Sequence, residues 1–293
     1  MTACMVKQRR EVLSGHAGAL ASKARATIEA PAFDLALLSD AGTDRANNED
    51  ACGSCLESDD CVIFAIADGV GGYEGGEIAS AQAIEVTLRA FSESPAGWGP
   101  AKRLHRAVLQ ANIEIHNRAL TVPQLRRMAT TLTAAVVSGG VLYAAHVGDC
   151  RIYHIRDGQI RQITKDHTVI QERVRMGLMS PARARYHPDR SVLSRCLGHE
   201  LIVAVDRLKL PLEQNDQLLI CSDGLYNVIA DDELCRETRG LDARAACRRL
   251  IELANRRGTP DNLTVAILNW KQGSAQISPG WRARMASLFR RHS

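Results

Sequence analysis

Aromatic residues are scarce in this chain of 293 residues: Phe, Trp and Tyr together make up 4% of it. A hydrophobic core must therefore be filled mainly by aliphatic side chains and alanine, and a hydrophobic share of 45% supplies them. With 24% charged residues, the composition is typical of a globular protein in water. The length allows one large domain or two small ones.

Long apolar runs are missing as well. No stretch of 18 apolar residues occurs, so we expect no transmembrane segment, and the N-terminus lacks the apolar part of a signal peptide. The net charge is only +4, with acids and bases interspersed, which argues against a nucleic-acid binder. Nine cysteines, an odd number scattered along the chain, indicate a reducing compartment. We therefore expect a cytoplasmic protein.

Cys52 and Cys55 have the spacing of a metal or redox motif, and Cys61 follows nearby. A zinc site usually has a second such pair. We therefore favour free thiols on a loop and a strand edge, with metal or redox use as the alternative.

Three regions differ in composition. Residues 1–31 are rich in alanine with scattered Lys and Arg, and we expect a loose helix or a disordered extension there. Residues 32–271 are predicted to form one continuous domain. Residues 272–293 form a basic tail, expected either to dock onto a partner or a membrane surface or to be a frayed terminus. Four apolar residues of this tail would share one helical face: Trp281, Met285, Leu288 and Phe289.

Two-residue turns predict two hairpins. Gly139-Gly140 separates the runs 132–138 and 141–147, and Asp157-Gly158 separates the runs 151–156 and 159–163. Further strands are expected at 33–38, 62–67, 201–208, 216–221 and 263–270. Apolar residues at helical spacing predict helices within 77–91, 104–115 and 246–253. Many antiparallel strands with a few long helices predict an α+β fold, two antiparallel sheets packed as a β-sandwich with helices on both sides.

A polar segment near residues 165–200 interrupts this pattern. It contains a helix-like stretch at 169–177, and we expect a movable flap over a site. Its arginines Arg183, Arg185 and Arg190 are expected to form a solvated face, with recognition of a phosphopeptide or acidic substrate as the alternative.

Three aspartates carry the strongest chemical signal. Asp68, Asp223 and Asp261 each flank an apolar run and are each followed by Gly or Asn. Such positions put carboxylates at the rim of a sheet, and together they would form an all-oxygen pocket suited to Mg²⁺ or Mn²⁺. Because carboxylates alone would repel one another, the cluster argues for a bound cation.

The chain resembles the metal-dependent serine/threonine protein phosphatases of the PPM, or type 2C, family in their bacterial form. The resemblance spans about residues 34–270 and implies the two-sheet sandwich. The matching segments follow the family's order: 39–50 (SDAGTDRANNED), 67–72 (ADGVGG), 77–80 (EIAS), 129–132 (ATTL), 146–153 (HVGDCRIY), 164–167 (TKDH), 194–198 (SRCLG), 221–225 (CSDGL) and 261–264 (DNLT).

The resemblance also implies roles for single residues. Asp68 would bridge two metal ions, with the Gly69 carbonyl on the second and Asp223 and Asp261 on the first. Glu49 would act through metal-bound water. Asp149 would help Asp223 to bind a weaker third metal. Arg45 matches the phosphate-binding arginine, so Arg45 and Asp68 are the candidate catalytic residues. Asp50 is the adjacent acid of the family, without an assigned role.

These roles predict hydrolysis of phosphoserine and phosphothreonine proteins by a metal-activated water, with Mn²⁺ or Mg²⁺ as two ions and a third as an option. By family analogy the enzyme would oppose a bacterial Ser/Thr kinase. One alternative is a catalytically silent, phosphoprotein-binding sensor of the same fold, and another is a metal-dependent nuclease, which the modest charge disfavours. A cysteine nucleophile is not expected.

Two positions depart from the family pattern. Val70 stands where animal relatives have a histidine, and Cys150 replaces the usual serine after Asp149. We expect Cys150 to be a buried, inert thiol, with oxidation near the metal as the alternative. Four histidines are expected to have structural or surface roles, because hard cations prefer oxygen ligands. These are His146, His154, His167 and His187.

Overall fold

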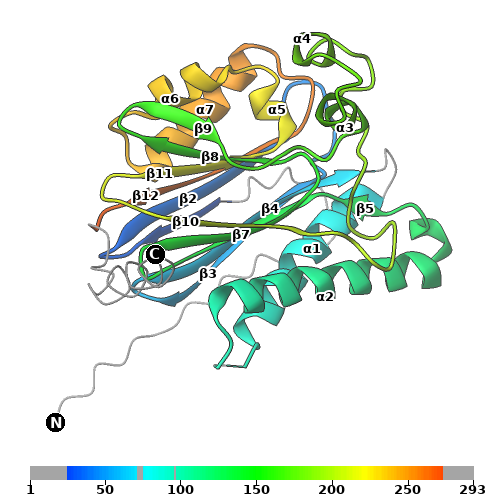
Figure 1. Ribbon diagram of the computed structural model, residues 1–293, viewed down its shortest axis with the longest axis horizontal. Helices are drawn as coiled ribbons and strands as arrows, with labels where there is room; N and C mark the ends of the chain where they lie inside the picture. Colours follow the sequence, from blue (N-terminus) through cyan, green and yellow to red (C-terminus); the bar gives the residue numbers. More distant parts are fainter. Residues whose placement is uncertain (1–24, 71–74, 96, 273–293) are drawn as a thin grey trace, which may run out of the picture.

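The computed structural model describes residues 25–70, 75–95 and 97–272, and in these residues two antiparallel sheets pack face to face (Figure 1). The first sheet has the order β1 (Arg25–Glu29), β2 (Phe33–Asp40), β12 (Leu263–Trp270), β11 (Gln217–Cys221), β8 (Arg151–Arg156) and β9 (Gln159–Gln162). The second has the order β10 (Asp206–Pro211), β7 (Val141–Val147), β6 (Leu132–Ser138), β4 (Cys61–Val70) and β3 (Asp50–Ser58). The short strand β5 (Ala129–Thr130) pairs with the end of β4.

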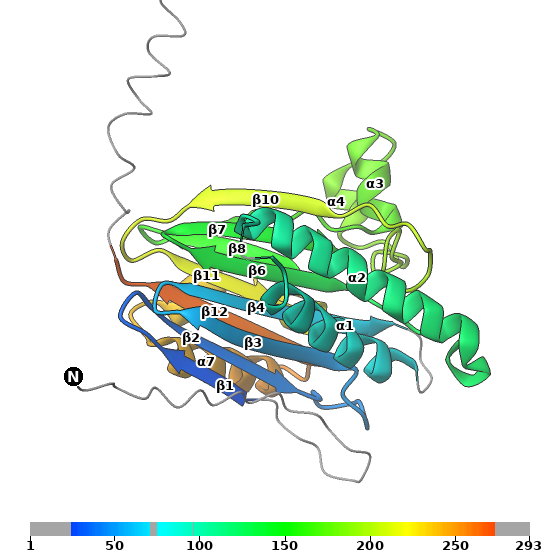
Figure 2. The same cartoon turned by 90° about the horizontal axis from the view of Figure 1, so that it is seen from below.

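Helices cover the outer face of each sheet. The long helices α1 (Gly75–Ser92) and α2 (Pro100–Thr121) lie on the second sheet, as Figure 2 shows from below. The helices α5 (Asp223–Tyr226), α6 (Asp231–Thr238) and α7 (Ala243–Arg256) lie on the first. The predicted α+β sandwich flanked by helices on both sides is therefore confirmed.

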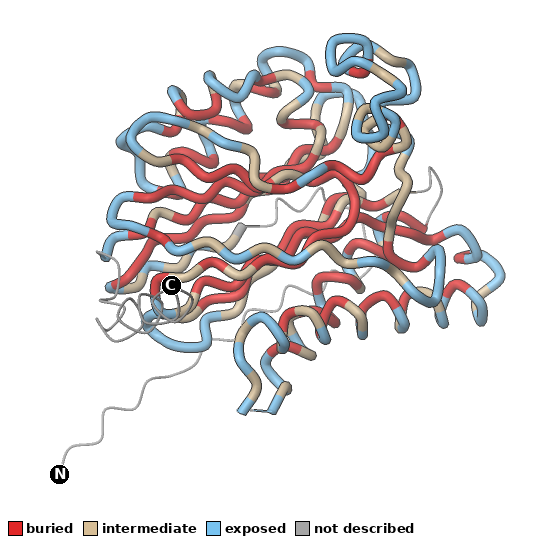
Figure 3. Tube along the Cα trace, in the orientation of Figure 1, coloured by how far each residue is buried: buried red, intermediate tan, exposed pale blue. Residues whose placement is uncertain are grey.

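The core has three layers, all built mainly from aliphatic residues. Phe33, Phe64 and Trp270 are buried among aliphatic side chains between the two sheets. A second cluster joins β4, β6 and β7 to α1 and α2, and a third joins the first sheet to α5, α6 and α7. Burying each aliphatic side chain contributes about 1.5–3 kcal/mol before chain entropy is counted. The buried strands stand out from the exposed connections in Figure 3.

The hairpin turns form where the sequence predicts them. Gly139 and Gly140 have φ of 56° and 73°, and Asp157 and Gly158 have φ of 52° and 74°. These positive values favour glycine or a short polar residue at the turn. The adjoining strands pair in the predicted register, Ser138 with Val141 and Arg156 with Gln159.

The flap predicted near 165–200 contains α3 (Val169–Arg175) and α4 (Pro181–Ala184) and projects from one end of the sandwich (Figure 1). Its arginines Arg183, Arg185 and Arg190 are exposed. Thr168 caps α3 by accepting a hydrogen bond from the backbone N–H of Gln171.

The prediction for residues 25–29 is wrong. We expected them within a helical or disordered extension, but they form β1, which pairs with β2 from Arg25↔Leu38 to Glu29↔Asp34. The segment alternates polar and apolar residues, as a strand does, but it is only five residues long. The alanine-rich composition around it favours a helix or a disordered extension instead. Residues 1–24 and 273–293, including the predicted tail helix, lie outside the described residues, as do residues 71–74 of the glycine-rich turn.

The strand expected at 201–208 is wrong in its first half. Residues 201–205 are irregular, and β10 begins at Asp206. The side-chain amide of Asn112 on α2 donates to the carbonyls of Glu200 and Leu201, at 2.9 and 3.0 Å. This segment is therefore held by a helix instead of a neighbouring strand.

Among the residues placed in the structure, none of the helices combines the length and the apolar character needed to cross a bilayer.

Candidate active site

The predicted site residues lie at one end of the sandwich, on strand ends, at the start of α5 and on the connections between elements. In the second sheet, Asp50 at the start of β3 pairs with Asp68 on β4. In the first sheet, Leu263 at the start of β12 pairs with Asp40 at the end of β2. The Ser222 hydroxyl, just after β11, donates to Asp50 Oδ2 at 2.7 Å, so the same ends of both sheets meet.

Asp68 is held by its backbone. Its N–H donates to Thr131 Oγ1 at 2.9 Å. Its carbonyl accepts from the Thr130 hydroxyl and the Thr131 N–H, both at 2.8 Å. These three hydrogen bonds fix the backbone of Asp68, and with it the position from which its side chain leaves the sheet. Sequence reasoning gave Thr130 and Thr131 no role, although a Thr-Thr pair before a buried strand was a usable signal.

Glu49 is fastened to the start of α1 and to the loop before β12. Its N–H donates to Asn262 Oδ1 at 2.8 Å, and its carbonyl accepts from Gly69 N–H at 3.1 Å and Ser80 Oγ at 2.6 Å. A Cβ added to Gly76 would lie 2.6 Å from Glu49 Oε2. A side chain at this position would therefore push the Glu49 carboxylate away from the start of α1.

Arg45 and Asp261 contact each other at the open edge of the site. Arg45 Nη2 lies 3.1 Å from Asp261 Oδ1, and the two side chains are 50% and 39% exposed. The Asp261 carboxylate also accepts from the Asn262 N–H at 2.9 Å. An exposed guanidinium next to a predicted metal ligand is suited to meet a phosphate that arrives from solvent.

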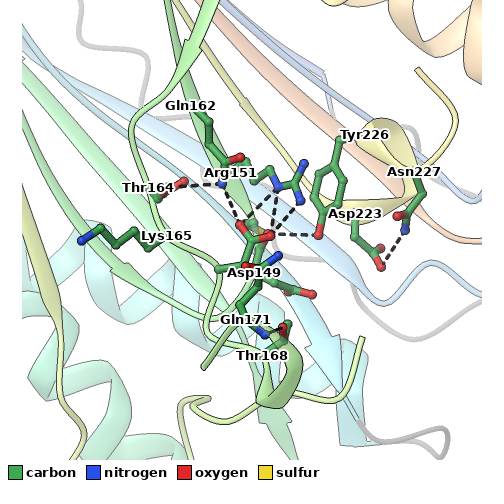
Figure 4. A network of polar contacts seen from close by, with 12 residues as sticks. Asp149, Arg151, Gln162, Thr164, Lys165, Thr168, Gln171, Asp223, Tyr226 and Asn227 are labelled. Atoms are coloured by element: carbon green, nitrogen blue, oxygen red, sulfur yellow. Dashed lines mark hydrogen bonds and ion pairs between the residues drawn. The ribbon is translucent and has the colours of Figure 1, made fainter. Parts of the chain in front are cut away.

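Asp149 and Asp223 sit on neighbouring turns (Figure 4). Asp223 opens α5, and its carboxylate accepts from the Asn227 side-chain amide at 3.1 Å. The Asp149 carbonyl accepts from the Tyr226 hydroxyl at 3.2 Å. The base of the flap adjoins this turn, because the His167 N–H donates to the Gly148 carbonyl at 2.8 Å.

The carboxylates raise one another's pKa. Burial, then the charges of Asp50 and Asp223, raise the pKa of Asp68 well above its usual range. Burial and the charge of Asp223 raise that of Asp149 in the same way. Burial raises the pKa of Asp50 to about 7 and that of Asp223 to about 6. Burial also raises the pKa of Glu49. The negative charges of Asp50, Asp68, Asp149 and Asp223 therefore act on one another within the site.

This donor set fits a hard divalent cation. It consists of carboxylate and carbonyl oxygens, and a cation would relieve the repulsion that raises these pKa values. Within the described part of the chain, the carboxylates do not converge on a common point: no three His, Cys, Asp or Glu residues stand as a ready ligand group. Asp223 and Asp261 instead contact Asn227 and Arg45.

The histidines have structural contacts. His146 Nδ1 lies 2.8 Å from Thr133 Oγ1 and its Nε2 lies 3.1 Å from the Lys165 carbonyl, while His154 Nε2 lies 3.0 Å from the Asp216 carboxylate. His167 Nδ1 accepts from the Gly148 N–H at 3.1 Å. These contacts suit structural roles for the three histidines, and His187 on the flap accepts from the Asp189 N–H at 3.1 Å.

Cys150, the cysteine next to Asp149, is not suited to act as a nucleophile. Cys150 is fully buried, and burial raises the pKa of its thiol well above the usual range, which supports an inert thiol. Cys150 and Arg156 have the Cys-x5-Arg spacing of a cysteine phosphatase loop, but the residues between them form the extended strand β8. Cys52 and Cys55 lie unpaired on the edge strand β3, as the favoured reading expected.

Comparisons with known proteins agree with this arrangement. The model of the family described as protein phosphatase 2C matches residues 42–267. The chain therefore belongs to the protein phosphatase 2C family. The matched range includes every candidate site residue from Arg45 to Asp261.

Two relatives of this family come from bacteria. The serine/threonine protein phosphatase PstP of Mycobacterium tuberculosis is 38% identical over 230 residues, which cover 78% of this chain and 43% of that protein. The serine/threonine phosphatase stp of Listeria monocytogenes is 34% identical over 240 residues, which cover 78% of this chain and 92% of that one. The chain thus spans less than half the length of the mycobacterial relative.

Solved structures of the family have the same fold. The crystal structure of M. tuberculosis PstP/Ppp aligns with a TM-score of 0.75 at 35% identity, covering 82% of this chain and all of that one. The catalytic domain of PstP in complex with two manganese ions aligns with a TM-score of 0.73 at 34% identity, covering 82% and 99%.

Proposed function

We propose that this chain is a metal-dependent protein serine/threonine phosphatase. The observation that carries the proposal is the joint presence, at one end of the sandwich, of an exposed arginine and a cluster of carboxylates with raised pKa values. Family membership and the manganese ions in the structure of a relative support it. The nuclease reading has no comparable support.

The residue roles follow the family pattern and are part of this proposal. Asp68, Asp223 and Asp261 would hold two Mn²⁺ or Mg²⁺ ions, with the Gly69 carbonyl and, through water, Glu49. Asp149 with Asp223 would hold a weaker third ion. Bound cations would supply charge neutralisation at the phosphate and a water of lowered pKa.

The chain's own residues then have defined tasks. Arg45 would bind two phosphate oxygens, because its planar guanidinium is charged at every working pH. Thr130 and Thr131 hold the backbone of Asp68 and thereby orient its carboxylate. Val70 has no acidic proton, so we assign the protonation of the leaving serine or threonine oxygen to a water.

The first test measures hydrolysis of p-nitrophenyl phosphate and of a phosphothreonine peptide with and without Mn²⁺. We expect turnover that chelation abolishes. Asp68→Asn and Asp223→Asn should each lower kcat about 100-fold or more, since metal-assisted catalysis supplies several kcal/mol. Asp59→Asn, an exposed aspartate in the β3–β4 turn, is the matched control and should behave as wild type.

Two outcomes would contradict the assignment. Full turnover after chelation would exclude a metal-dependent reaction. Near-wild-type rates of either aspartate variant would exclude its role as a ligand. Phosphopeptide binding without turnover would instead favour the catalytically silent alternative.

We further propose that the substrates are phosphoproteins of a bacterial Ser/Thr kinase and that the protein works in the cytoplasm. The phosphatase names of the relatives support phosphoprotein substrates. Eight cysteines without a disulfide among the described residues suit a reducing compartment. Phosphoproteomics of a strain lacking the gene would identify the substrates by their increased phosphorylation.

A further inference from the structure

Tyr226 connects the two turns that carry Asp149 and Asp223. It is the last residue of α5, one helical turn beyond Asp223, which opens the helix. Its hydroxyl donates to the backbone carbonyl of Asp149 at 3.2 Å. Figure 4 shows the phenol ring between the Asp149 turn and the α5 turn.

One face of the Tyr226 ring contacts Arg151. The Arg151 guanidinium lies over the ring, 3.6 Å from its centroid. Arg151 in turn contacts the buried Asp166 carboxylate, with Nη2 at 2.8 Å and Nε at 3.2 Å from its oxygens. The Gln162 amide donates to the same carboxylate at 2.8 Å. Arg151, which lies over the ring, is therefore itself fixed by Asp166, and Asp166 by Gln162 of β9.

Tyr226 also has a close counterpart in the same network. The Tyr153 hydroxyl accepts from Arg151 Nη1 at 3.1 Å, but it donates to Asp231 Oδ1 at 2.9 Å. The two tyrosines share Arg151 as a neighbour, and of the two only Tyr226 is bonded to the Asp149 turn. The Tyr226 hydroxyl therefore contacts a turn of the proposed site, whereas the Tyr153 hydroxyl contacts Asp231 at the start of α6.

We propose that Tyr226 is a positioning residue that holds the Asp149 turn opposite Asp223, so that these two acids together bind a divalent cation. The inference rests on the proposed function, because Asp149 and Asp223 are ligands only within it. Arg151 contributes by fixing the plane of the Tyr226 ring. The cation affected is the one that needs Asp149, and the ions assigned to Asp68, Asp223 and Asp261 do not depend on the Tyr226 hydroxyl.

Calorimetric titration of the full chain with Mn²⁺ tests this. Tyr226→Phe keeps the ring over Arg151 and removes only the hydroxyl. We expect the weakest Mn²⁺-binding step to weaken by about 3- to 10-fold, the effect of one hydrogen bond, with the tighter steps unchanged. The Mn²⁺ concentration for half-maximal hydrolysis should rise by the same factor, and KM for p-nitrophenyl phosphate should stay constant. Tyr153→Phe should leave all Mn²⁺-binding steps as in wild type.

Each other outcome has a definite meaning. If Tyr226→Phe binds Mn²⁺ as wild type does, the inference fails and the proposed function stands. If Tyr153→Phe weakens the weakest Mn²⁺-binding step equally, the effect does not depend on the hydrogen bond to the Asp149 turn, and the inference also fails. If the wild-type chain binds no Mn²⁺ at all, the proposed function fails first and the inference fails with it.

Discussion

At the scale of single residues, the proposed phosphate-binding residue Arg45 is open to solvent. It is half exposed, and the Asp261 carboxylate with which it forms an ion pair is 39% exposed. Exposed ion pairs contribute little to stability, about 0–1 kcal/mol. Breaking this ion pair would therefore change the stability of the fold little, and a phosphate dianion can compete with Asp261 for the Arg45 guanidinium.

Arg45→Ala should chiefly weaken phosphate binding. Hydrogen bonds to charged groups contribute about 1.5–3 kcal/mol each, so KM for a phosphothreonine peptide should rise about 10-fold or more with a smaller change in kcat. Arg45→Lys should recover part of this, because lysine keeps the charge and loses the planar fork. Arg89→Ala removes an arginine of similar exposure that pairs with Glu114 on α2, and it should leave KM unchanged. An unaltered KM in Arg45→Ala would contradict the phosphate-binding role.

Single residues also show which parts of the site can be predicted from the sequence. The resemblance names Asp68 and Asp223 because their Asp-Gly pairs follow apolar strands. It includes Asn262 in the matching segment 261–264 but gives it no role, although its side chain accepts from the Glu49 N–H and donates to the carbonyls of Ala41 and Asn47. Those contacts join segments more than 200 residues apart, so they depend on the folded arrangement and have no local pattern.

At the scale of elements, the flap between His167 and Arg195 is anchored at both ends to one carboxylate. Asp206 Oδ2 lies 3.2 Å from His167 Nε2, and Asp206 Oδ1 accepts from Arg195 Nη1 at 3.0 Å. A second anchor is the pairing of Thr130 with Leu197, which joins the flap's far end to β5. Asp206 stands at the start of β10, outside the flap, so the clamp connects the flap to the sheet.

Asp206→Asn should loosen the flap without unfolding the sandwich. Losing the charge on the shared partner should lower the local opening free energy by about 1–2 kcal/mol, which raises the open population about 5- to 30-fold. Limited trypsin digestion followed by mass spectrometry should show faster cleavage at the exposed Arg183, Arg185 and Arg190. Asp232→Asn on α6 is the control and should be cut at the wild-type rate. Equal cleavage of both variants would show that Asp206 does not hold the flap.

Predictions of helices and strands are correct mainly where the residues that determine the element lie close to it in the sequence. The Gly139-Gly140 and Asp157-Gly158 hairpins are correct because two residues fix the turn and the strands pair next to it. β1 is an exception, because it pairs with the next strand, β2, and the prediction fails on the alanine-rich composition around it. The irregular 201–205 segment was missed because Asn112, some 90 residues away, decides its conformation.

At the scale of the whole molecule, the two sheets are joined by a buried histidine. His146 lies on β7 of the second sheet beside Thr133 of β6. Because the Lys165 carbonyl can only accept, His146 Nε2 carries the proton and Nδ1 accepts from the Thr133 hydroxyl. Lys165 follows β9 of the first sheet. Both ring nitrogens are thus used in the neutral form, and burial, then the charge of His167, lowers the pKa of His146 to about 4.

This histidine should make the fold sensitive to acid. In the unfolded chain a histidine takes up a proton near pH 6.5, whereas His146 in the folded protein remains neutral to about pH 4. The unfolded state therefore binds more protons between these values, and the contribution of neutral His146 to stability, at most about 3 kcal/mol, is present above pH 6.5 and is lost as the pH falls towards 4. His146→Gln should lower the free energy of unfolding in urea more at pH 7 than at pH 4.5. His199→Asn, an exposed histidine, should have little effect at either pH. A His146→Gln effect that is the same at both pH values would show that protonation of this residue is not linked to unfolding.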